Sequence, residues 1–340
     1  MRTVPATPEM DEYRDRIRRF RECHDQIRAQ VGRVIVGQDE TVEHLLITLW
    51  AGGHCLITGL PGTAKTLLVR TLAQALALGF KRIQFTPDLM PTDITGTDIL
   101  EEDASTGRRK WTFSPGPIFT HVLLADEVNR TPPKTQAALL EAMQEGSCTV
   151  RGTTYALERP FFVLATQNPI EMEGTYPLPE AQLDRFLFNV LLDYLGAGEE
   201  VKVVARNTSQ ELPTVEACTN AEEIVGFRGL VKKVLLSDEA ARYAVDLVRA
   251  TRPGEPSAPE DVRKYVKYGA SVRATQFLVL AAKARALTRG RYHVGAEDLQ
   301  ALLLPVLRHR LITNFHAESD GIGPDEILRR MLAGFRPLTA

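Results

Sequence analysis

The sequence has few of the features that mark exported, membrane-inserted or metal-binding proteins. Its four cysteines, Cys23, Cys55, Cys148 and Cys218, include no pair at the two-residue spacing of zinc ribbons and redox motifs. No run approaches the ~18 consecutive apolar residues of a transmembrane helix, and the acidic N-terminal stretch is unlike a signal peptide. We therefore expect reduced thiols, no membrane insertion and a soluble, cytoplasmic protein.

The sequence also lacks an excess of charge of one sign. Lys and Arg number 41 against 43 for Asp and Glu, which gives a net charge of -2. Proteins that bind the phosphates of nucleic acids usually present a broad basic surface, so this balance argues against a nucleic-acid partner. With 44% hydrophobic residues, the 340-residue chain can bury a sizeable core, and its length predicts about two domains.

Hydrophobic periodicity divides the chain into three parts. Residues 1–30 form an N-terminal helical segment, because apolar side chains recur at near-helical spacing from Tyr13 to Ile27. Residues 31–192 alternate helical stretches with short, continuous apolar runs, which are typical of strands buried on both faces of a parallel sheet. The runs lie at 54–58, 81–86, 121–125, 161–166 and 186–192. The sequence therefore predicts an α/β core whose parallel sheet is flanked by helices.

Helical periodicity dominates from residue 193 onward. Three helices are predicted at 237–252, 274–290 and 295–311, and such helices need a bundle of their own. Asp298 follows Gly295 by three residues and is predicted to help to cap the last of them. We therefore expect residues 193–340 to form a small all-α domain.

The segment GLPGTAKT (59–66) lies between the first predicted strand and a helix. A polyphosphate needs inward-pointing backbone N–H groups, a helix N-terminus, a Lys for its outer phosphates and a hydroxyl for magnesium. Lys65 and Thr66 supply the last two. The strict P-loop pattern has Gly where Ala64 stands, and we expect alanine to be tolerated where the loop enters the helix. The residues expected to contact nucleotide here are Gly59, Pro61, Gly62, Thr63, Ala64, Lys65, Thr66 and Leu67.

Two adjacent acids, Asp126 and Glu127, follow the predicted strand at 121–125. Ligands of open α/β sheets bind at the carboxyl ends of the strands. Asp126 is therefore expected to hold magnesium through its water shell, and Glu127 to polarise the attacking water. The alternative is a pair of solvated loop acids, but their position at the end of a buried strand favours the functional interpretation.

Two further polar residues occur at comparable positions. Asn168 follows the apolar run at 161–166, from where its amide can reach between a γ-phosphate and the attacking water. Arg185 ends a helical turn just before the last predicted strand and is a candidate arginine finger. Either residue alone would usually be a cap or a surface charge, so the order and spacing of the segments support these roles.

With these segments in order, the sequence resembles the MoxR family of AAA+ ATPases through most of residues 31–315. The resemblance rests on VIVGQD (34–39), GLPGTAKT (59–66), LLADEVNR (123–130), ATQNPIEMEGTYPLPEAQLDRF (165–186) and GASVRATQ (269–276), of which the last three are the most specific. MoxR proteins resemble this chain even in having alanine before the P-loop lysine.

The resemblance implies a P-loop NTPase core of the AAA+ type that holds ATP against a helical lid. Lys65 and Thr66 match the residues that bind phosphate and magnesium, and Asp126 and Glu127 match the Walker B pair, with Asp126 and Thr66 at the metal. Asn168 matches sensor 1.

The same resemblance implies an assembly, with hexameric rings as its usual form. Arg185 matches the finger that reaches a neighbouring subunit's ATP, and Arg273 matches the lid's sensor 2. Val36 and Gly37 fall where such proteins contact adenine. Arg130 matches an interface residue, with a simple salt bridge as the equal alternative.

Two segments of the core are interpreted as insertions. Residues 91–119 occupy the place of the helix-2 insert of this AAA+ branch, and residues 147–161 are predicted to form a β-hairpin. The resemblance places both on the pore or substrate side of a ring.

The function that the resemblance implies is a chaperone-like ATPase that remodels or matures a protein client, commonly together with a von Willebrand factor A domain protein. A DNA-acting motor is one alternative, although the net charge of -2 argues against it. The ATPase subunit of a metal-chelatase-like complex is another.

Overall fold

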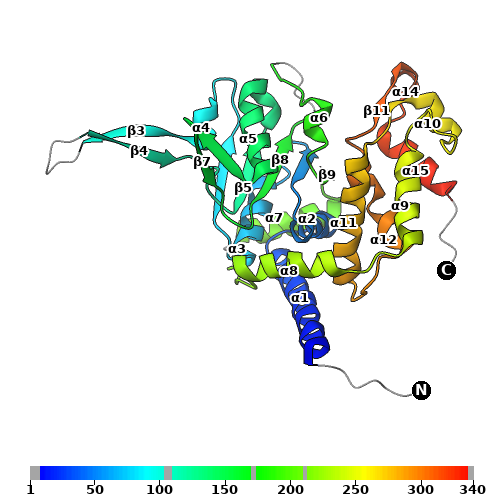
Figure 1. Ribbon diagram of the computed structural model, residues 1–340, viewed down its shortest axis with the longest axis horizontal. Helices are drawn as coiled ribbons and strands as arrows, with labels where there is room; N and C mark the ends of the chain where they lie inside the picture. Colours follow the sequence, from blue (N-terminus) through cyan, green and yellow to red (C-terminus); the bar gives the residue numbers. More distant parts are fainter. Residues whose placement is uncertain (1–7, 103–108, 170–173, 210–212, 336–340) are drawn as a thin grey trace.

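The computed structural model describes residues 8–102, 109–169, 174–209 and 213–335 (Figure 1). Its centre is a five-stranded parallel sheet with the order β2-β5-β8-β1-β9. Each apolar run expected to form a strand contributes one of the five. The strands are β1 (Cys55–Gly59), β2 (Phe80–Gln84), β5 (Val122–Asp126), β8 (Phe162–Gln167) and β9 (Phe188–Leu192). The predicted parallel α/β core is confirmed.

The inner strands are buried on both faces because helices cover the sheet on either side. In β5, Val122 and Leu124 join the hydrophobic cluster that contains α2 (Asp39–Ala51) and α3 (Lys65–Ala75). Leu123 and Ala125 point the other way and join the cluster that contains α5 (Pro133–Glu145). Strand β2 differs from the prediction, because it is an edge strand and most of its side chains are not buried.

The N-terminal helix α1 (Pro8–Gly32) belongs to the core. Its side chains Ile17, Phe20 and Ile27 are fully buried. Phe20 packs edge-on against Trp50 of α2 and Phe227 of α8 (Ala221–Lys233), with ring centroids 5.3 and 5.2 Å apart. This aromatic contact joins α1 to helices from two distant parts of the chain.

The His54 side chain connects the start of β1 to β8 and α5. Its Nδ1 accepts a hydrogen bond from the Val163 N–H and its Nε2 donates to the Met143 carbonyl, both at 3.0 Å. Complete burial lowers the pKa of His54 to about 4. The neutral imidazole therefore holds the start of β1 against β8 and α5.

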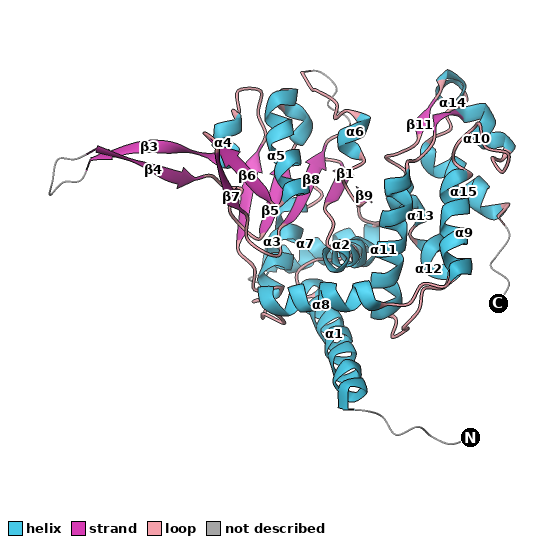
Figure 2. Cartoon of the chain, in the orientation of Figure 1, coloured by secondary structure: helices cyan, strands magenta, loops and turns pink. Residues whose placement is uncertain are grey.

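The C-terminal part is helical, as predicted (Figure 2). After α8 it contains a small antiparallel pair, β10 (Val266–Tyr268) with β11 (Ile312–Thr313), which the sequence did not predict. The other elements from α7 onward are α7 (Ala197–Ser209), α9 (Asp238–Arg249), α10 (Glu260–Tyr265), α11 (Val272–Thr288), α12 (Ala296–Ala301), α13 (Leu303–Leu307), α14 (Phe315–Ser319) and α15 (Pro324–Ala333).

The single helix predicted over residues 295–311 is in fact the two short helices α12 and α13. They meet at Leu302, whose φ of -103° and ψ of 3° interrupt the helix. The break lets α12 pack against α9 while α13 packs against β9 and α15. A straight helix could not make both contacts.

Asp298 caps α12 as predicted and does more than cap. Its Oδ2 accepts the Gly295 N–H at 3.0 Å. The same buried carboxylate accepts from the guanidinium groups of Arg285 and Arg291 at 2.6 Å. It therefore ties α11 to the start of α12.

Two hairpins extend the core away from the lid (Figure 1). After α4 (Pro91–Thr95), strands β3 (Gly96–Glu102) and β4 (Arg109–Pro115) pair as a projecting antiparallel arm. Strands β6 (Ser147–Val150) and β7 (Thr153–Ala156) form the second hairpin. Phe113 stacks on Tyr155 at 4.0 Å, and the Arg151 guanidinium lies 4.9 Å from the centroid of the Trp111 ring. The two hairpins therefore support each other.

The structure also bears on the cysteines and on membrane insertion. All four cysteines are free thiols, and Cys218 is the most exposed of them. Within the described ranges, no helix has both the length and the apolar character needed to cross a membrane.

Candidate nucleotide-binding site

The phosphate loop connects β1 to the N-terminus of α3 and forms one wall of a cavity of about 340 Å³. This wall runs from Pro61 to Leu67. The opposite wall comes from the carboxyl ends of β8, which pairs with β1, and of β5, which lies on the other side of β8. It consists of Asp126, Glu127, Thr166, Gln167 and Asn168. The parallel sheet thus gathers into one cavity residues that are about a hundred positions apart.

Lys65 is folded back onto its own loop. Its Nζ donates to the carbonyls of Gly59 at 2.8 Å and Leu60 at 2.6 Å. Partial burial lowers the pKa of Lys65, while the charges of Asp126 and Glu127 act in the opposite direction. The ammonium group can exchange these carbonyls for the oxygens of a phosphate without leaving the cavity.

Asp126 is already paired with a cation. Its Oδ2 lies 2.6 Å from Nη2 of Arg82 on β2, and its Oδ1 accepts the Thr166 hydroxyl at 2.6 Å. The carboxylate is largely buried, whereas Arg82 is half exposed. Buried carboxylates need compensating charge, so this position is suited to a positive ion.

Glu127 points differently from Asp126 because its backbone changes conformation at the end of β5. Its φ of 57° lies in the left-handed region, and its N–H donates to the Thr166 hydroxyl at 2.8 Å. Its Oε2 accepts from Nε2 of Gln84 at 2.8 Å and pairs with Nε of Arg130 at 3.1 Å. Arg130 lies in the short helix η1 (Val128–Arg130) and forms this salt bridge within one subunit, while its role at an interface stays a prediction.

Arg82, Gln84 and Thr166 are site residues that the sequence reasoning missed. Strand β2 pairs with β5 so that Gln84 stands opposite Asp126, which brings Arg82 and Gln84 to the two acids. Polar residues in a run interpreted as a buried strand were the available signal. Their target could not be identified without the strand order.

Ala64 does not have the conformation that we expected. We expected alanine to fit the entry to the helix, but its φ of 59° and ψ of 25° are left-handed. This region costs a non-glycine residue roughly 1–2 kcal/mol, because Cβ approaches the following carbonyl oxygen. The loop turns sharply there to direct the N-terminus of α3 at the cavity, so the alanine is strained.

Ala64→Gly is therefore expected to stabilise the fold by about 1 kcal/mol, since the relief of strain exceeds the entropy that glycine adds to the unfolded chain. Urea unfolding of the two proteins measures the difference. Ala73→Gly in the regular part of α3 is the matched control and should lower stability. Equal losses in both variants would contradict the assignment of strain.

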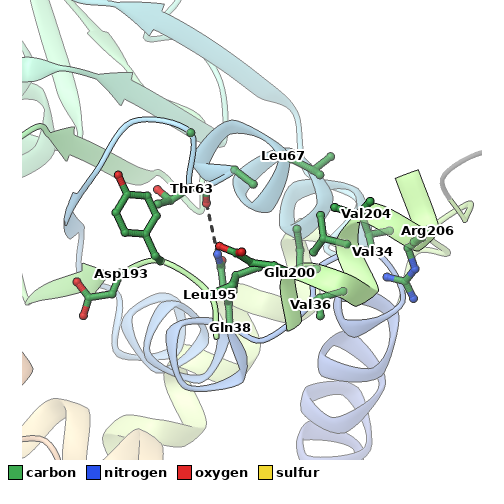
Figure 3. A pocket seen from close by; sticks show the side chains of 15 residues that line it. Val34, Val36, Gln38, Thr63, Leu67, Asp193, Leu195, Glu200, Val204 and Arg206 are labelled. Atoms are coloured by element: carbon green, nitrogen blue, oxygen red, sulfur yellow. Dashed lines mark hydrogen bonds between the residues drawn. The ribbon is translucent and has the colours of Figure 1, made fainter. Parts of the chain in front are cut away.

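A second cavity of about 290 Å³ adjoins the first and shares Gly62, Thr63, Ala64 and Leu67 with it (Figure 3). Much of its lining is apolar. It includes Val34, Ile35, Val36, Leu67, Leu195, Val203 and Val204. Such walls suit a planar base, and a few polar groups at the edge suit its ring nitrogens. Gln38 is one of them, and its Nε2 donates to the Thr63 carbonyl at 3.3 Å.

Two glycines named as nucleotide contacts have steric roles. Gly37 has a φ of 72°, and a Cβ there would lie 2.4 Å from the Glu199 carboxyl carbon. A Cβ on Gly59 would lie 2.6 Å from the Leu192 carbonyl oxygen. A side chain at Gly59 would therefore displace the backbone of β9, whereas at Gly37 the Glu199 side chain could move aside and the positive φ is what favours glycine.

Arg185 and Arg273 line neither cavity. Arg185 follows α6 (Glu180–Leu183), and its Nη1 donates to the Leu140 carbonyl of α5 at 2.9 Å. Nη1 of Arg273, at the start of α11, lies 3.8 Å from Oδ2 of Asp184. The structure therefore places both arginines beside Asp184 and away from the phosphate loop.

A parallel sheet with a phosphate loop after β1, paired acids at the end of β5 and a helical lid defines a P-loop ATPase of the AAA+ class. Comparison with known proteins agrees. Residues 54–188 match the model of the ATPase family associated with various cellular activities, and residues 259–331 match the AAA lid domain.

The chain belongs to the MoxR family of AAA+ ATPases. It is 42% identical to Chaperone MoxR1 of Mycobacterium tuberculosis, over 92% of this chain and 82% of that protein. It is 43% identical to the uncharacterized protein YeaC of Bacillus subtilis, over 90% and 92% of the two chains. A crystal structure from Cytophaga hutchinsonii, provisionally assigned as an ATPase, superposes with a TM-score of 0.90 at 40% identity, over 98% of this chain and all of that one.

Proposed function

We propose that this MoxR-family ATPase hydrolyses magnesium-bound ATP in a ring of identical subunits and uses the resulting lid movement to remodel or mature a protein client. The convergence of Lys65, Asp126, Glu127 and Asn168 on one cavity supports the proposal most strongly. The adjoining apolar cavity, with Val36 in its lining, accommodates adenine.

The site fits magnesium. Magnesium prefers oxygen ligands, and the hydroxyl of Thr66 and the carboxylate of Asp126 line the same cavity. The Arg82 guanidinium 2.6 Å from Asp126 supports this fit, since the carboxylate accepts positive charge in its present surroundings. When bound, magnesium would neutralise charge on the transferring phosphates.

Each polar residue of the cavity has a separate task in hydrolysis. The backbone N–H groups from Gly62 to Lys65 and the Lys65 ammonium hold the phosphates. Glu127 accepts hydrogen bonds from Gln84 and Arg130, so it can orient and polarise the attacking water once those partners shift. Asn168 fixes that water relative to the γ-phosphate.

The remaining positive charge comes from two arginines outside the cavity. Arg185 contacts Leu140 in its own subunit and serves as the finger for the neighbouring subunit's ATP. Arg273 is the sensor that the lid turns toward its own γ-phosphate. A finger that acts on a neighbouring subunit's ATP requires a closed ring, and we propose that this ring has six subunits.

We further propose that residues 31–192 act as the nucleotide-binding core and 193–340 as the lid, with 1–30 as an N-terminal segment whose helix α1 packs against α3 of the core and α11 of the lid. The insert at 91–119 and the hairpin at 147–161 face the client. The partners are a protein client and a von Willebrand factor A domain protein. The word chaperone in the name of the Mycobacterium tuberculosis relative supports the client role.

A trapped complex tests this proposal. Glu127→Gln with ATP is expected to sediment as a ring and to retain the client and the von Willebrand factor A domain protein from native lysate. Lys65→Ala, which lacks the phosphate-binding ammonium, is the control and should retain neither. A ring that forms equally in both variants and captures no protein would argue against remodelling.

A further inference from the structure

One carboxylate joins the finger segment to the lid. Asp184 immediately precedes Arg185, and its Oδ1 accepts from Nε of Arg310 at 2.7 Å. Its Oδ2 accepts the Ser271 hydroxyl at 3.0 Å and lies 3.8 Å from Nη1 of Arg273. Three lid residues therefore converge on a core residue next to the proposed finger.

Arg310 holds the backbone on both sides of that finger. Its Nη2 donates to the carbonyls of Asp184 at 3.0 Å and Phe186 at 2.5 Å. The side chain is 2% exposed, and burial lowers the pKa of Arg310 to about 10, so it remains charged at neutral pH. The lid residue Arg310 therefore binds the residues on both sides of Arg185.

The contact between Arg273 and Asp184 is weak enough to be exchanged. The Arg273 side chain is 42% exposed, and solvent-exposed ion pairs contribute little. A γ-phosphate carries more negative charge than a carboxylate and can draw Arg273 away. Because ADP lacks this phosphate, only ATP would compete with Asp184.

We propose that Asp184 is the positioning residue that couples a subunit's own nucleotide, sensed by Arg273, to the placement of the same subunit's Arg185 in the neighbouring site. This inference rests on the proposed function of the two arginines. When ATP draws Arg273 away from Asp184, the lid residue Arg310 still grips the finger segment, so the lid's movement shifts Arg185. Occupancy of one site thereby sets hydrolysis in the next, and the coupling is reciprocal for binding.

Asp184→Asn tests the coupling in the full-length assembly. The unmutated protein should show a sigmoidal dependence of ATP hydrolysis on ATP concentration, and the variant should approach a Hill coefficient of 1. Asp325→Asn is the matched control, because Asp325 pairs with the neighbouring lid residue Arg308 at 2.9 Å and does not involve the finger segment. The control should keep the sigmoidal curve.

Mixed assemblies give a second measurement. Lys65→Ala subunits cannot bind ATP, so their fingers should stay in the resting position and fail to activate the neighbouring site. Each such subunit should therefore lower the hydrolysis rate of the assembly by more than its own share. Lys65→Ala/Asp184→Asn subunits should lower it only in proportion. A purely structural role for Asp184 would not produce this difference.

Asp184→Asn leaves the buried Arg310 without its charged partner and can prevent folding. Two milder variants keep the proposal testable in that case. Ser271→Ala removes one hydrogen bond to Oδ2 and should reduce the Hill coefficient partly, while Asp184→Glu should restore coupling in part. If Arg185 is required for hydrolysis but all these variants keep the sigmoidal ATP dependence of the unmutated protein, the proposed coupling through Asp184 is wrong. If Arg185 is not required, the proposed function itself fails.

Discussion

Glu127→Gln is expected to lower the turnover of ATP by about 10²- to 10⁴-fold, the usual contribution of a positioned general base. The amide keeps the shape of the side chain but cannot take a proton from water. Lys65, Thr66 and Asp126 are untouched, so nucleotide affinity should change only a few-fold. Steady-state hydrolysis and titration with a fluorescent ATP analogue measure the two quantities separately.

A glutamate outside the cavity supplies the control for this variant. Glu145→Gln makes the same chemical change at an exposed position near the end of α5. It should leave both hydrolysis and nucleotide binding unaltered. Hydrolysis by Glu127→Gln at the rate of Glu145→Gln would show that another residue activates the water.

Arg185→Ala is expected to remove most of the assembly-dependent hydrolysis, since a finger supplied in trans is typically worth ~10³–10⁵ in rate. The physical reason is loss of the positive charge that meets the transferring phosphoryl group. Because Arg185 lines neither cavity of its own subunit, nucleotide binding should persist. Rates measured across a range of protein concentrations test the dependence on assembly.

Complementation distinguishes a finger from a structural arginine. Arg185→Ala subunits keep an intact cavity, and Lys65→Ala subunits keep the Arg185 side chain, so mixing the two inactive proteins should restore part of the activity. Lys65→Ala/Asp184→Asn subunits, in which the finger no longer depends on the subunit's own nucleotide, should restore more. Arg263→Ala is the matched control, because Arg263 also donates to a backbone carbonyl, that of Pro256 at 3.0 Å, on the exposed lid surface. Absence of complementation by both Lys65→Ala and Lys65→Ala/Asp184→Asn subunits, together with normal ring formation, would exclude a role in trans.

Local sequence was sufficient for the strands and for most of the cavity. Four of the five strands of the sheet are continuous apolar runs, and burial from both sides explains why they could be recognised singly, whereas β2 is an edge strand with a mixed sequence. Lys65 and Asp126 could be named because each lies at the end of such a run. Parallel strands bring their carboxyl ends to one edge, so the meeting of these residues followed from the predicted topology.

Contacts between distant segments could not be predicted in this way. Arg82 and Gln84 lie on a strand that differs from its neighbours only by being at the edge of the sheet, and their pairing with the two acids depends on the β2–β5 register. The break at Leu302 follows from two packing partners that α12 and α13 do not share. The polar residues of β2 and Pro305 in α13 are local signals, but neither identifies the partners that these segments contact.

The sequence by itself determined the class of this protein, because a phosphate-binding loop and its partner acids are short motifs whose chemistry is set by residue type and spacing. Only the tertiary structure decided the backbone strain at Ala64, the pairing of Arg82 with Asp126 and the convergence of lid and finger on Asp184. These depend on how the chain turns and on which elements pack together, and such interactions act between residues that are far apart in the sequence.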